Sequence, residues 1–178
     1  MIAVDWFGPY DLEGAKKAAN SDYGDGLYMC IGKRPYQRAP ALQYVGIGIQ
    51  VRTRLKEDHH KLQEVTKQRS MWLGEVVTAE PSGKKIKVTP ATLDYAEWLH
   101  ARFLRLPLNE KKTKGLPPRS VTVLNRWWRT DYATPRRKRP HPDWPDLIDY
   151  PSYGLPARLV WFGKGQRHIL GPDYADPT

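Results

Sequence analysis

Two tripeptides, Gly26-Leu27-Tyr28 and Tyr44-Val45-Gly46, carry the clearest fold signal in this sequence. They lie in two apolar stretches with strand character, Gly26–Ile31 and Ala41–Ile47. The connector between them, residues 32–40, is rich in residues that favour turns, among them Gly and Pro. The sequence therefore predicts a β-hairpin with one tyrosine of interest on each strand.

Further elements follow the hairpin. Apolar positions at helical spacing predict a helix over residues 49–67, and two more strands are expected over residues 71–78 and 85–89. A second helix begins with Thr89 as N-cap and Pro90 in the first turn, and it ends before Leu106-Pro107. This order of elements predicts a small α/β sandwich, with a mixed or antiparallel sheet flanked by helices.

The bulk composition narrows the class of protein. The chain has 178 residues, of which 40% are hydrophobic, so it can bury a core. No apolar run approaches ~20 residues, and the first residues lack the apolar segment of a signal peptide. We therefore expect a cytoplasmic protein without a membrane span, in which the single cysteine, Cys30, is a buried thiol.

The net charge of +10 and the pI near 9.7 favour a polyanionic partner such as nucleic acid. The composition changes after Glu110 into a basic, Pro-rich part. We expect residues 1–21 to be a lead-in that packs on the domain, residues 22–110 to form the domain, and residues 111–178 to be a basic C-terminal extension that contacts nucleic acid. Within the extension, a strand is expected over residues 120–128, and a last hairpin over residues 159–170.

Three polar residues extend the pattern of the two tyrosines. Arg54 stands ten residues after Tyr44, Glu97 lies in the second helix, and Asn109 follows Glu97 by twelve residues. In this order and at these spacings, Tyr28, Tyr44, Arg54, Glu97 and Asn109 resemble the GIY-YIG nuclease family over residues 26–109. The resemblance implies a metal-dependent endonuclease that hydrolyses phosphodiester bonds in DNA, with double-stranded DNA as the expected substrate.

Glu97 is the most informative single residue. Its position on the helix matches three apolar neighbours, Leu93, Ala101 and Leu104. A carboxylate among apolar groups is costly unless a cation or a donor satisfies it. The alternative is a Glu at the helix edge that turns to solvent or pairs with Arg102 or Lys85. The resemblance implies that Glu97 is the only protein ligand of Mg²⁺ or Mn²⁺, which suits a carboxylate with waters and a phosphate.

Arg54 and the two tyrosines can be interpreted in two ways: as catalytic residues, which the resemblance implies, or as ordinary structural residues. A guanidinium can clamp a phosphate and stabilise charge in the transition state. Spacing alone leaves Arg52 as a competitor, and the family pattern selects Arg54. The resemblance implies that one tyrosine, Tyr28 or Tyr44, assists deprotonation of the attacking water while the other positions water or phosphate. Otherwise Arg54 is a solvated helix residue and both tyrosines belong to the core or to an edge strand.

One position departs from the family. The family commonly has His or Tyr four residues after the Arg, where this sequence has Asp58, followed by His59 and His60. Either His59 takes the role through a small helical shift, or the role is missing or filled from elsewhere. Asn109 matches the family's Pro-x-Asn, in which the Asn braces the site by hydrogen bonds, and Asn125 is the alternative for this brace.

The remaining predictions concern contacts with nucleic acid. Basic and aromatic side chains together provide charge for phosphates and surfaces for stacking. Alternatively the tryptophans 127 and 128 complete the core, and the basic run 136–139 is a solvated loop. A non-catalytic nucleic-acid-binding module that keeps the fold also explains the charge, but it has no reason to tolerate a carboxylate at position 97. A ribosomal or RNA-associated basic protein explains the charge but not the ordered set of Tyr, Tyr, Arg, Glu and Asn. The residues expected at the nucleic acid are Lys33, Arg52, Lys56, Arg126, Trp128, Arg136, Arg137, Lys138 and Arg139.

Overall fold

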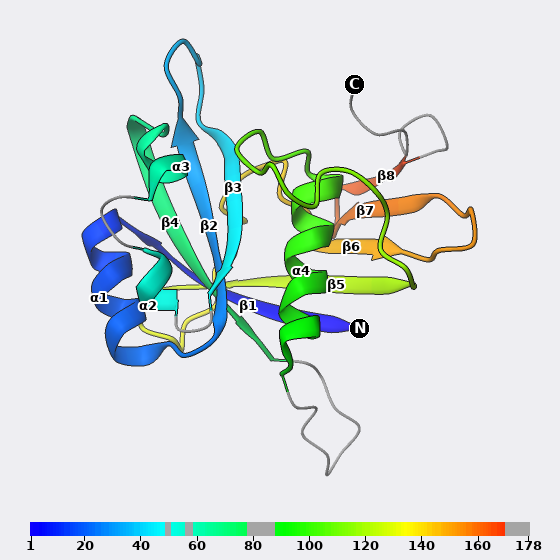
Figure 1. Ribbon diagram of the computed structural model, residues 1–178, viewed down its shortest axis with the longest axis horizontal. Helices are drawn as coiled ribbons and strands as arrows, with labels where there is room; N and C mark the ends of the chain where they lie inside the picture. Colours follow the sequence, from blue (N-terminus) through cyan, green and yellow to red (C-terminus); the bar gives the residue numbers. More distant parts are fainter. Residues whose placement is uncertain (49–50, 56–58, 78–87, 170–178) are drawn as a thin grey trace.

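The computed structural model describes residues 1–48, 51–55, 59–77 and 88–169 (Figure 1). The elements of this part, in chain order, are β1 (Ile2–Tyr10), α1 (Leu12–Asp22), β2 (Gly26–Lys33), β3 (Ala41–Gly48), α2 (Val51–Arg54), α3 (His60–Gln63), β4 (Lys67–Val76), α4 (Pro90–Phe103), β5 (Val121–Trp128), β6 (Leu147–Tyr150), β7 (Ala157–Trp161) and β8 (Gly165–Ile169).

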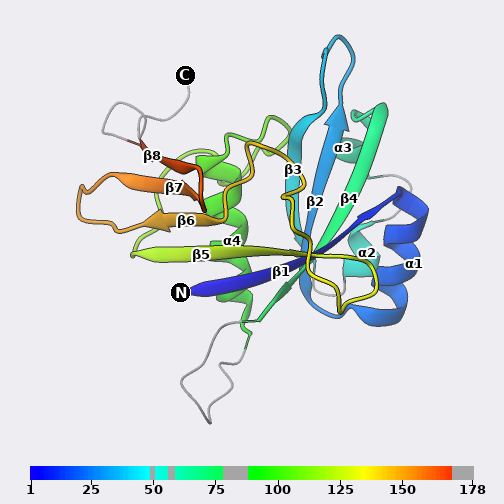
Figure 2. The same cartoon turned by 180° about the vertical axis from the view of Figure 1, so that it is seen from behind.

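The strands form one mixed sheet in the order β3-β2-β4-β1-β5-β6-β7-β8. Strands β1 and β5 pair in parallel, and the other neighbours are antiparallel. Strands β2, β3 and β4 run steeply across the direction of β5 to β8, so the sheet is strongly curled (Figures 1 and 2). The expected α/β class with a mixed sheet is confirmed at this level.

The predicted hairpin is present as β2 and β3. Tyr28 pairs with Gly46, and Cys30 pairs with Tyr44. Because residues two apart on a strand point to the same side, both tyrosines lie on one face of the sheet. Cys30 is buried on this face, as expected. The hairpin thus brings together two side chains that are sixteen residues apart in the sequence.

Alternate residues of β2 belong to two different cores. Leu27 and Met29 join a core that includes α4 and several tryptophans, and Tyr28 joins a second core that includes residues of α1, α2 and α3. Helix α4 begins as predicted: the Thr89 side chain caps it by accepting from the Thr92 amide at 3.3 Å. The sheet therefore carries helices on both faces, and the tyrosine face is the one next to α1, α2 and α3.

The helix predicted over residues 49–67 is wrong as one element. In the described part it is replaced by the short helices α2 and α3, and β4 already begins at Lys67. Its apolar positions Val51, Leu55, Leu62 and Val65 are nevertheless all buried in one core. The Thr66 amide donates to the Lys33 carbonyl at 3.0 Å, so the chain already pairs with β2 where the predicted helix would end.

The strand predicted at residues 71–78 is present in longer form as β4. Most of the strand predicted over residues 85–89 lies outside the described residues, and residues 88–89 lead directly into α4 without strand structure. Strand β5 and the hairpin β7–β8 confirm the elements expected near residues 120–128 and 159–170.

The structure corrects two expectations about the ends of the chain. Residues 1–21 are more than a lead-in, because β1 lies inside the sheet between β4 and β5. Residues 111–178 are more than an extension, since β5 to β8 continue the same sheet and the Trp127 ring is buried in the core around α4. Both corrections have one cause: β1 pairs with strands that are distant in the sequence. Among the described helices, none has the length and apolar character needed to cross a bilayer.

Candidate active site

A pocket of about 660 Å³ lies where α4 and the chain after it meet the hairpin and the short helices α2 and α3. All six residues predicted for the catalytic centre line this pocket, although each comes from a different element or connection. They are Tyr28, Tyr44, Arg54, His59, Glu97 and Asn109.

Gly46 explains how the Tyr28 ring reaches the pocket. A Cβ at position 46 would lie 2.5 Å from both Cζ and Oη of Tyr28, so a side chain there would displace the ring. The sequence alone did not indicate this role for Gly46, because the role depends on the pairing of Tyr28 with this glycine across the two strands. The absence of a side chain on β3 therefore lets the phenol lie across the strand.

His59 joins the two tyrosines. Its Nε2 lies 2.9 Å from the Tyr28 hydroxyl, and its ring centroid lies 5.4 Å from that of Tyr44. The His60 side chain is exposed and stacks on His59. Of the two histidines, His59 is thus the one in contact with the tyrosines, while Asp58 lies outside the described residues.

Burial raises the pKa of Tyr28, and the adjacent Tyr44 raises it further, whereas Arg54 acts in the opposite direction. Burial also raises the pKa of Tyr44, although its hydrogen bond with Tyr28 and the charge of Arg54 oppose the shift. Both phenols are therefore protonated at neutral pH. Either one needs a proton acceptor or an additional cation to act as a base. His59 Nε2 can be that acceptor for Tyr28 in the tautomer that carries its proton on Nδ1.

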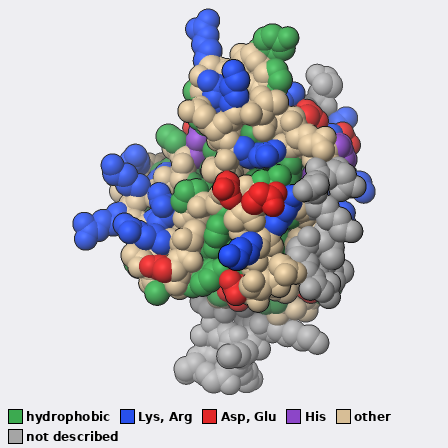
Figure 3. All heavy atoms as spheres, turned by 90° about the vertical axis from the view of Figure 1, so that its left-hand side faces the viewer, with side chains coloured by type: hydrophobic (Ala, Val, Ile, Leu, Met, Phe, Trp, Pro, Cys, Tyr) green, Lys and Arg blue, Asp and Glu red, His purple; other side chains and the backbone are tan. Residues whose placement is uncertain are grey.

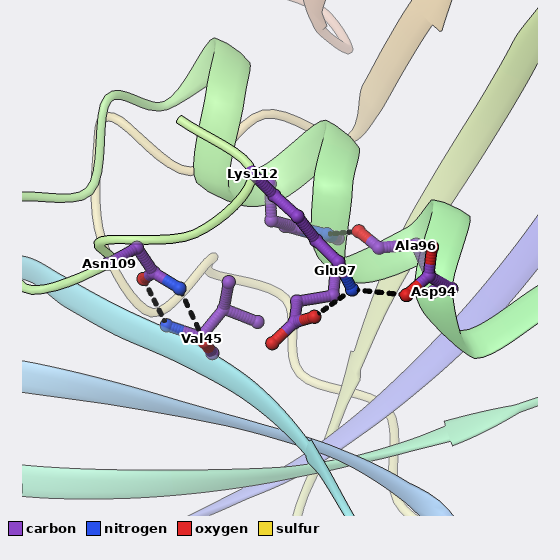
Figure 4. A network of polar contacts seen from close by, with 7 residues as sticks. Val45, Asp94, Ala96, Glu97, Asn109 and Lys112 are labelled. Carbon is purple, nitrogen blue, oxygen red and sulfur yellow. Dashed lines mark hydrogen bonds and ion pairs between the residues drawn. The ribbon is translucent and has the colours of Figure 1, made fainter. Parts of the chain in front are cut away.

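Asn109 braces the edge of the sheet. Its Oδ1 accepts from the Val45 amide at 3.0 Å, and its Nδ2 donates to the Val45 carbonyl at 2.8 Å (Figure 4). Strand β3 is the last strand of the sheet, so this side chain takes the place of a neighbouring strand. The alternative brace, Asn125, is buried elsewhere and bonds with Trp6 and His100.

Glu97 is 13% exposed and forms an ion pair with Lys112, whose Nζ also lies 2.5 Å from Asp94 Oδ1 (Figure 4). Lys112 is neither of the two partners that the sequence suggested for Glu97, Arg102 and Lys85. Arg102 instead donates to the Thr113 carbonyl at 2.7 Å, and Lys85 lies outside the described residues. The sequence offered one signal for Asp94, namely its position one helical turn before Glu97.

The donor set suits a hard cation. Two carboxylates of one helix already surround the Lys112 ammonium, and Mg²⁺ commonly uses one or two carboxylates with waters and a phosphate. No group of three or more His, Cys, Asp or Glu side chains that could hold a metal occurs in the described residues. A divalent ion at these two carboxylates would take most of its ligands from water and substrate.

Arg54 ends α2, and its exposed side chain lines the pocket. The pocket also contains charged residues that we did not predict from the sequence, Lys61 and Glu110, which form an ion pair with each other. In the view of Figure 3, basic side chains are spread over the surface with acidic ones among them.

The residues predicted to contact nucleic acid lie apart from the pocket where they are described. Arg126 makes a two-pronged ion pair with Asp5 at 2.7 and 3.0 Å, and the Trp128 ring stacks on Phe7. Lys33 ends β2 and is partly buried. The Arg52 side chain and Lys56 lie outside the described part.

The basic run 136–139 divides into two kinds of residue. Arg136 lies over the Trp72 ring, with its Cζ 5.3 Å from the centroid, and Arg139 bonds with Asp146 at 2.8 Å. Arg137 and Lys138 are exposed. Two of the four cations thus hold the connection between β5 and β6, and the other two are exposed. The connection runs beside the hairpin (Figure 2), where His141 Nε2 lies 3.0 Å from the Pro40 carbonyl oxygen.

Comparisons of the chain with family models, with curated proteins and with solved structures give no match.

Proposed function

We propose that this protein is a metal-dependent endonuclease of the GIY-YIG type that hydrolyses phosphodiester bonds in double-stranded DNA. One observation carries the proposal: the six side chains selected from the sequence line a single pocket. The net charge of +10 supports a polyanionic substrate.

We assign the roles from the resemblance to the family, together with the position of each group in the pocket. Arg54 binds the scissile phosphate and stabilises the charge that develops on it. Water attacks the phosphorus and passes a proton to the Tyr28 oxygen, as the Tyr28 proton moves to His59 Nε2. The P–O ester bond breaks, and the leaving oxygen takes a proton from solvent.

Tyr44 orients the water or the phosphate beside Tyr28. Glu97 holds the divalent ion, Mg²⁺ or Mn²⁺, which when bound neutralises charge on the leaving oxygen. Asn109 is a positioning residue, because it contacts the backbone of the strand that carries Tyr44.

The test is nicking of supercoiled plasmid with and without Mg²⁺. We expect Glu97→Gln to abolish nicking and Arg54→Lys to slow it by at least ~100-fold, the scale for losing one preorganised donor in the transition state. Glu13→Gln on α1 and Arg158→Lys on β7 are matched controls, because both residues are exposed and far from the pocket in the fold.

Duplex affinity, measured without divalent ions, should stay near the wild-type value in Glu97→Gln. Nicking by this variant at the wild-type rate would exclude Glu97 from the mechanism.

A non-catalytic nucleic-acid-binding module is the second candidate. It is favoured by one observation, the ion pair with Lys112, which satisfies the Glu97 carboxylate without a metal. Duplex binding by the wild-type protein without nicking in Mg²⁺ or Mn²⁺ would support this module and refute the nuclease.

A further inference from the structure

The pocket neutralises its own acidic groups. Its three acidic residues are Asp94, Glu97 and Glu110, and each contacts a lysine of the same pocket. Lys112 contacts the first two, and Lys61 contacts Glu110. The carboxylates that suit a divalent cation are therefore already engaged by side-chain ammonium groups.

Lys112 is held in place by the chain on both sides of it. On one side, Asn109 is bonded to the β3 backbone, and on the other, Arg102 donates to the Thr113 carbonyl at 2.7 Å. The backbone of Lys112 has φ 61°, in the left-handed region that residues other than Gly seldom adopt. Such a conformation persists where the surroundings hold it, and here it directs the ammonium to Glu97.

This ammonium and a divalent ion compete for the same oxygen atoms. The side chains of Lys112 and Glu97 are only 19% and 13% exposed, so water screens their contact weakly. Two cations at one carboxylate repel each other, and the ion enters only as Lys112 moves away. The Asp94 side chain is 46% exposed, so it is the more accessible of the two carboxylates that contact Lys112.

Resting on the proposed function, we propose that Lys112 is a built-in competitor for the divalent cation at Glu97, and that the phosphates of a bound nucleic acid release it. A phosphate offers the ammonium a new partner, and Glu97 then becomes available to the ion. Cation binding and nucleic acid binding are therefore positively coupled, and the coupling is the same in both directions.

The experiment measures Mn²⁺ affinity of the full chain by electron paramagnetic resonance, which counts the free ion and does not depend on activity. Lys112→Met keeps the length of the side chain and removes its charge. It should bind Mn²⁺ at least roughly tenfold more tightly than wild type, because a charge-assisted hydrogen bond no longer has to be broken.

The controls separate competition from general charge. Lys111→Met makes the same change of net charge at an exposed neighbour that also lines the pocket, and it should bind Mn²⁺ as wild type does. Glu97→Gln should bind more weakly than wild type. Lys112→Gln is a second, polar variant that should reproduce the gain if Lys112→Met folds poorly, which circular dichroism will show.

A short duplex tests the release, with the titration of Glu97→Gln subtracted to account for ions held by the duplex itself. The duplex should raise the Mn²⁺ affinity of the wild-type protein by a larger factor than that of Lys112→Met, in which a phosphate can add a ligand to the ion but has no ammonium to release. An equal rise in both proteins would overturn release by phosphate.

Competition would be overturned if Lys112→Met and Lys112→Gln bound no more tightly than wild type, or if Lys111→Met showed the same gain. If the wild-type protein nicks plasmid and the Lys112 variants bind Mn²⁺ as wild type does, this inference is refuted and the proposed nuclease function stands. Tight Mn²⁺ binding by Lys112→Met without nicking by any variant would refute the nuclease and support the competition.

Discussion

Asn109→Ala should destabilise the fold through the edge of the sheet. The variant loses both hydrogen bonds to Val45, and no neighbouring strand can replace them because β3 is the last strand. Val45 is 0% exposed, so water has poor access to its amide and carbonyl groups. At about 1–2 kcal/mol for each buried group left without a partner, the free energy of unfolding should fall by about 2–4 kcal/mol.

Urea denaturation followed by tryptophan fluorescence measures this loss. With an m value of about 2 kcal/mol per M, the midpoint should fall by about 1–2 M at unchanged m. Asn20→Ala, at an exposed position of α1, is the matched control and should shift the midpoint little. An Asn109→Ala variant as stable as Asn20→Ala would refute the brace.

Asn109→Asp tests the direction of the two hydrogen bonds. The Asp carboxylate can still accept from the Val45 amide, but its second oxygen faces the Val45 carbonyl without a proton. This contact raises the pKa of the new carboxyl, so the variant is least stable above that pKa and recovers as the carboxyl is protonated. Its deficit relative to wild type should therefore be smaller at pH 4 than at pH 7; a deficit independent of pH would contradict the assignment.

Three further outcomes can be measured with the same purified protein. Gly46→Ala should lower the free energy of unfolding by about 1–3 kcal/mol, because its Cβ would lie 2.5 Å from Cζ and Oη of Tyr28. Urea denaturation measures this change, and a variant as stable as wild type would contradict the expectation. Burial lowers the pKa of His100 to about 4, against 6.5 in an unfolded chain. Wild type should therefore lose on the order of 3 kcal/mol of stability as the pH falls from about 6.5 to about 4, and His100→Gln should lack this share of the loss. Changing the exposed pair Arg137 and Lys138 to Ala should flatten the slope of log K against log salt for duplex DNA by about 2, and an unaltered slope would show that neither contacts a phosphate.

The parts of the fold that could be predicted are those with local signals. The hairpin follows from two apolar strands with a turn between them, and α4 from Thr89 and Pro90 at its start. Strand β1 was missed because its pairing is not local: Trp6 lies opposite Gly74 on one side and Trp127 on the other. Nothing near residue 6 in the sequence indicates either partner.

The candidate site was predictable to the extent that its residues follow an ordered motif. Residues that reach the site only because a loop carries them there could not be predicted, and Lys112 is the clearest case. Its sequence context is that of a basic linker, and its contact with Glu97 arises because Asn109 ties the preceding residues to β3. For a similar reason the sequence did not show which cations of the run 136–139 are engaged and which are exposed, since the tertiary fold sets the partners of Arg136 and Arg139.

The position of β1 between β4 and β5 also decides how this protein can be divided. A fragment of residues 22–110 would keep the six catalytic candidates but lose Lys111 and Lys112 of the pocket. It would also expose the backbone of β4 along a bare edge and lose the Trp6 ring from the core. Bare edges of this kind promote aggregation. The region that holds the pocket therefore cannot be moved alone into another protein, because the move would break the sheet that supports it. Fusion partners should be attached at the ends of the chain.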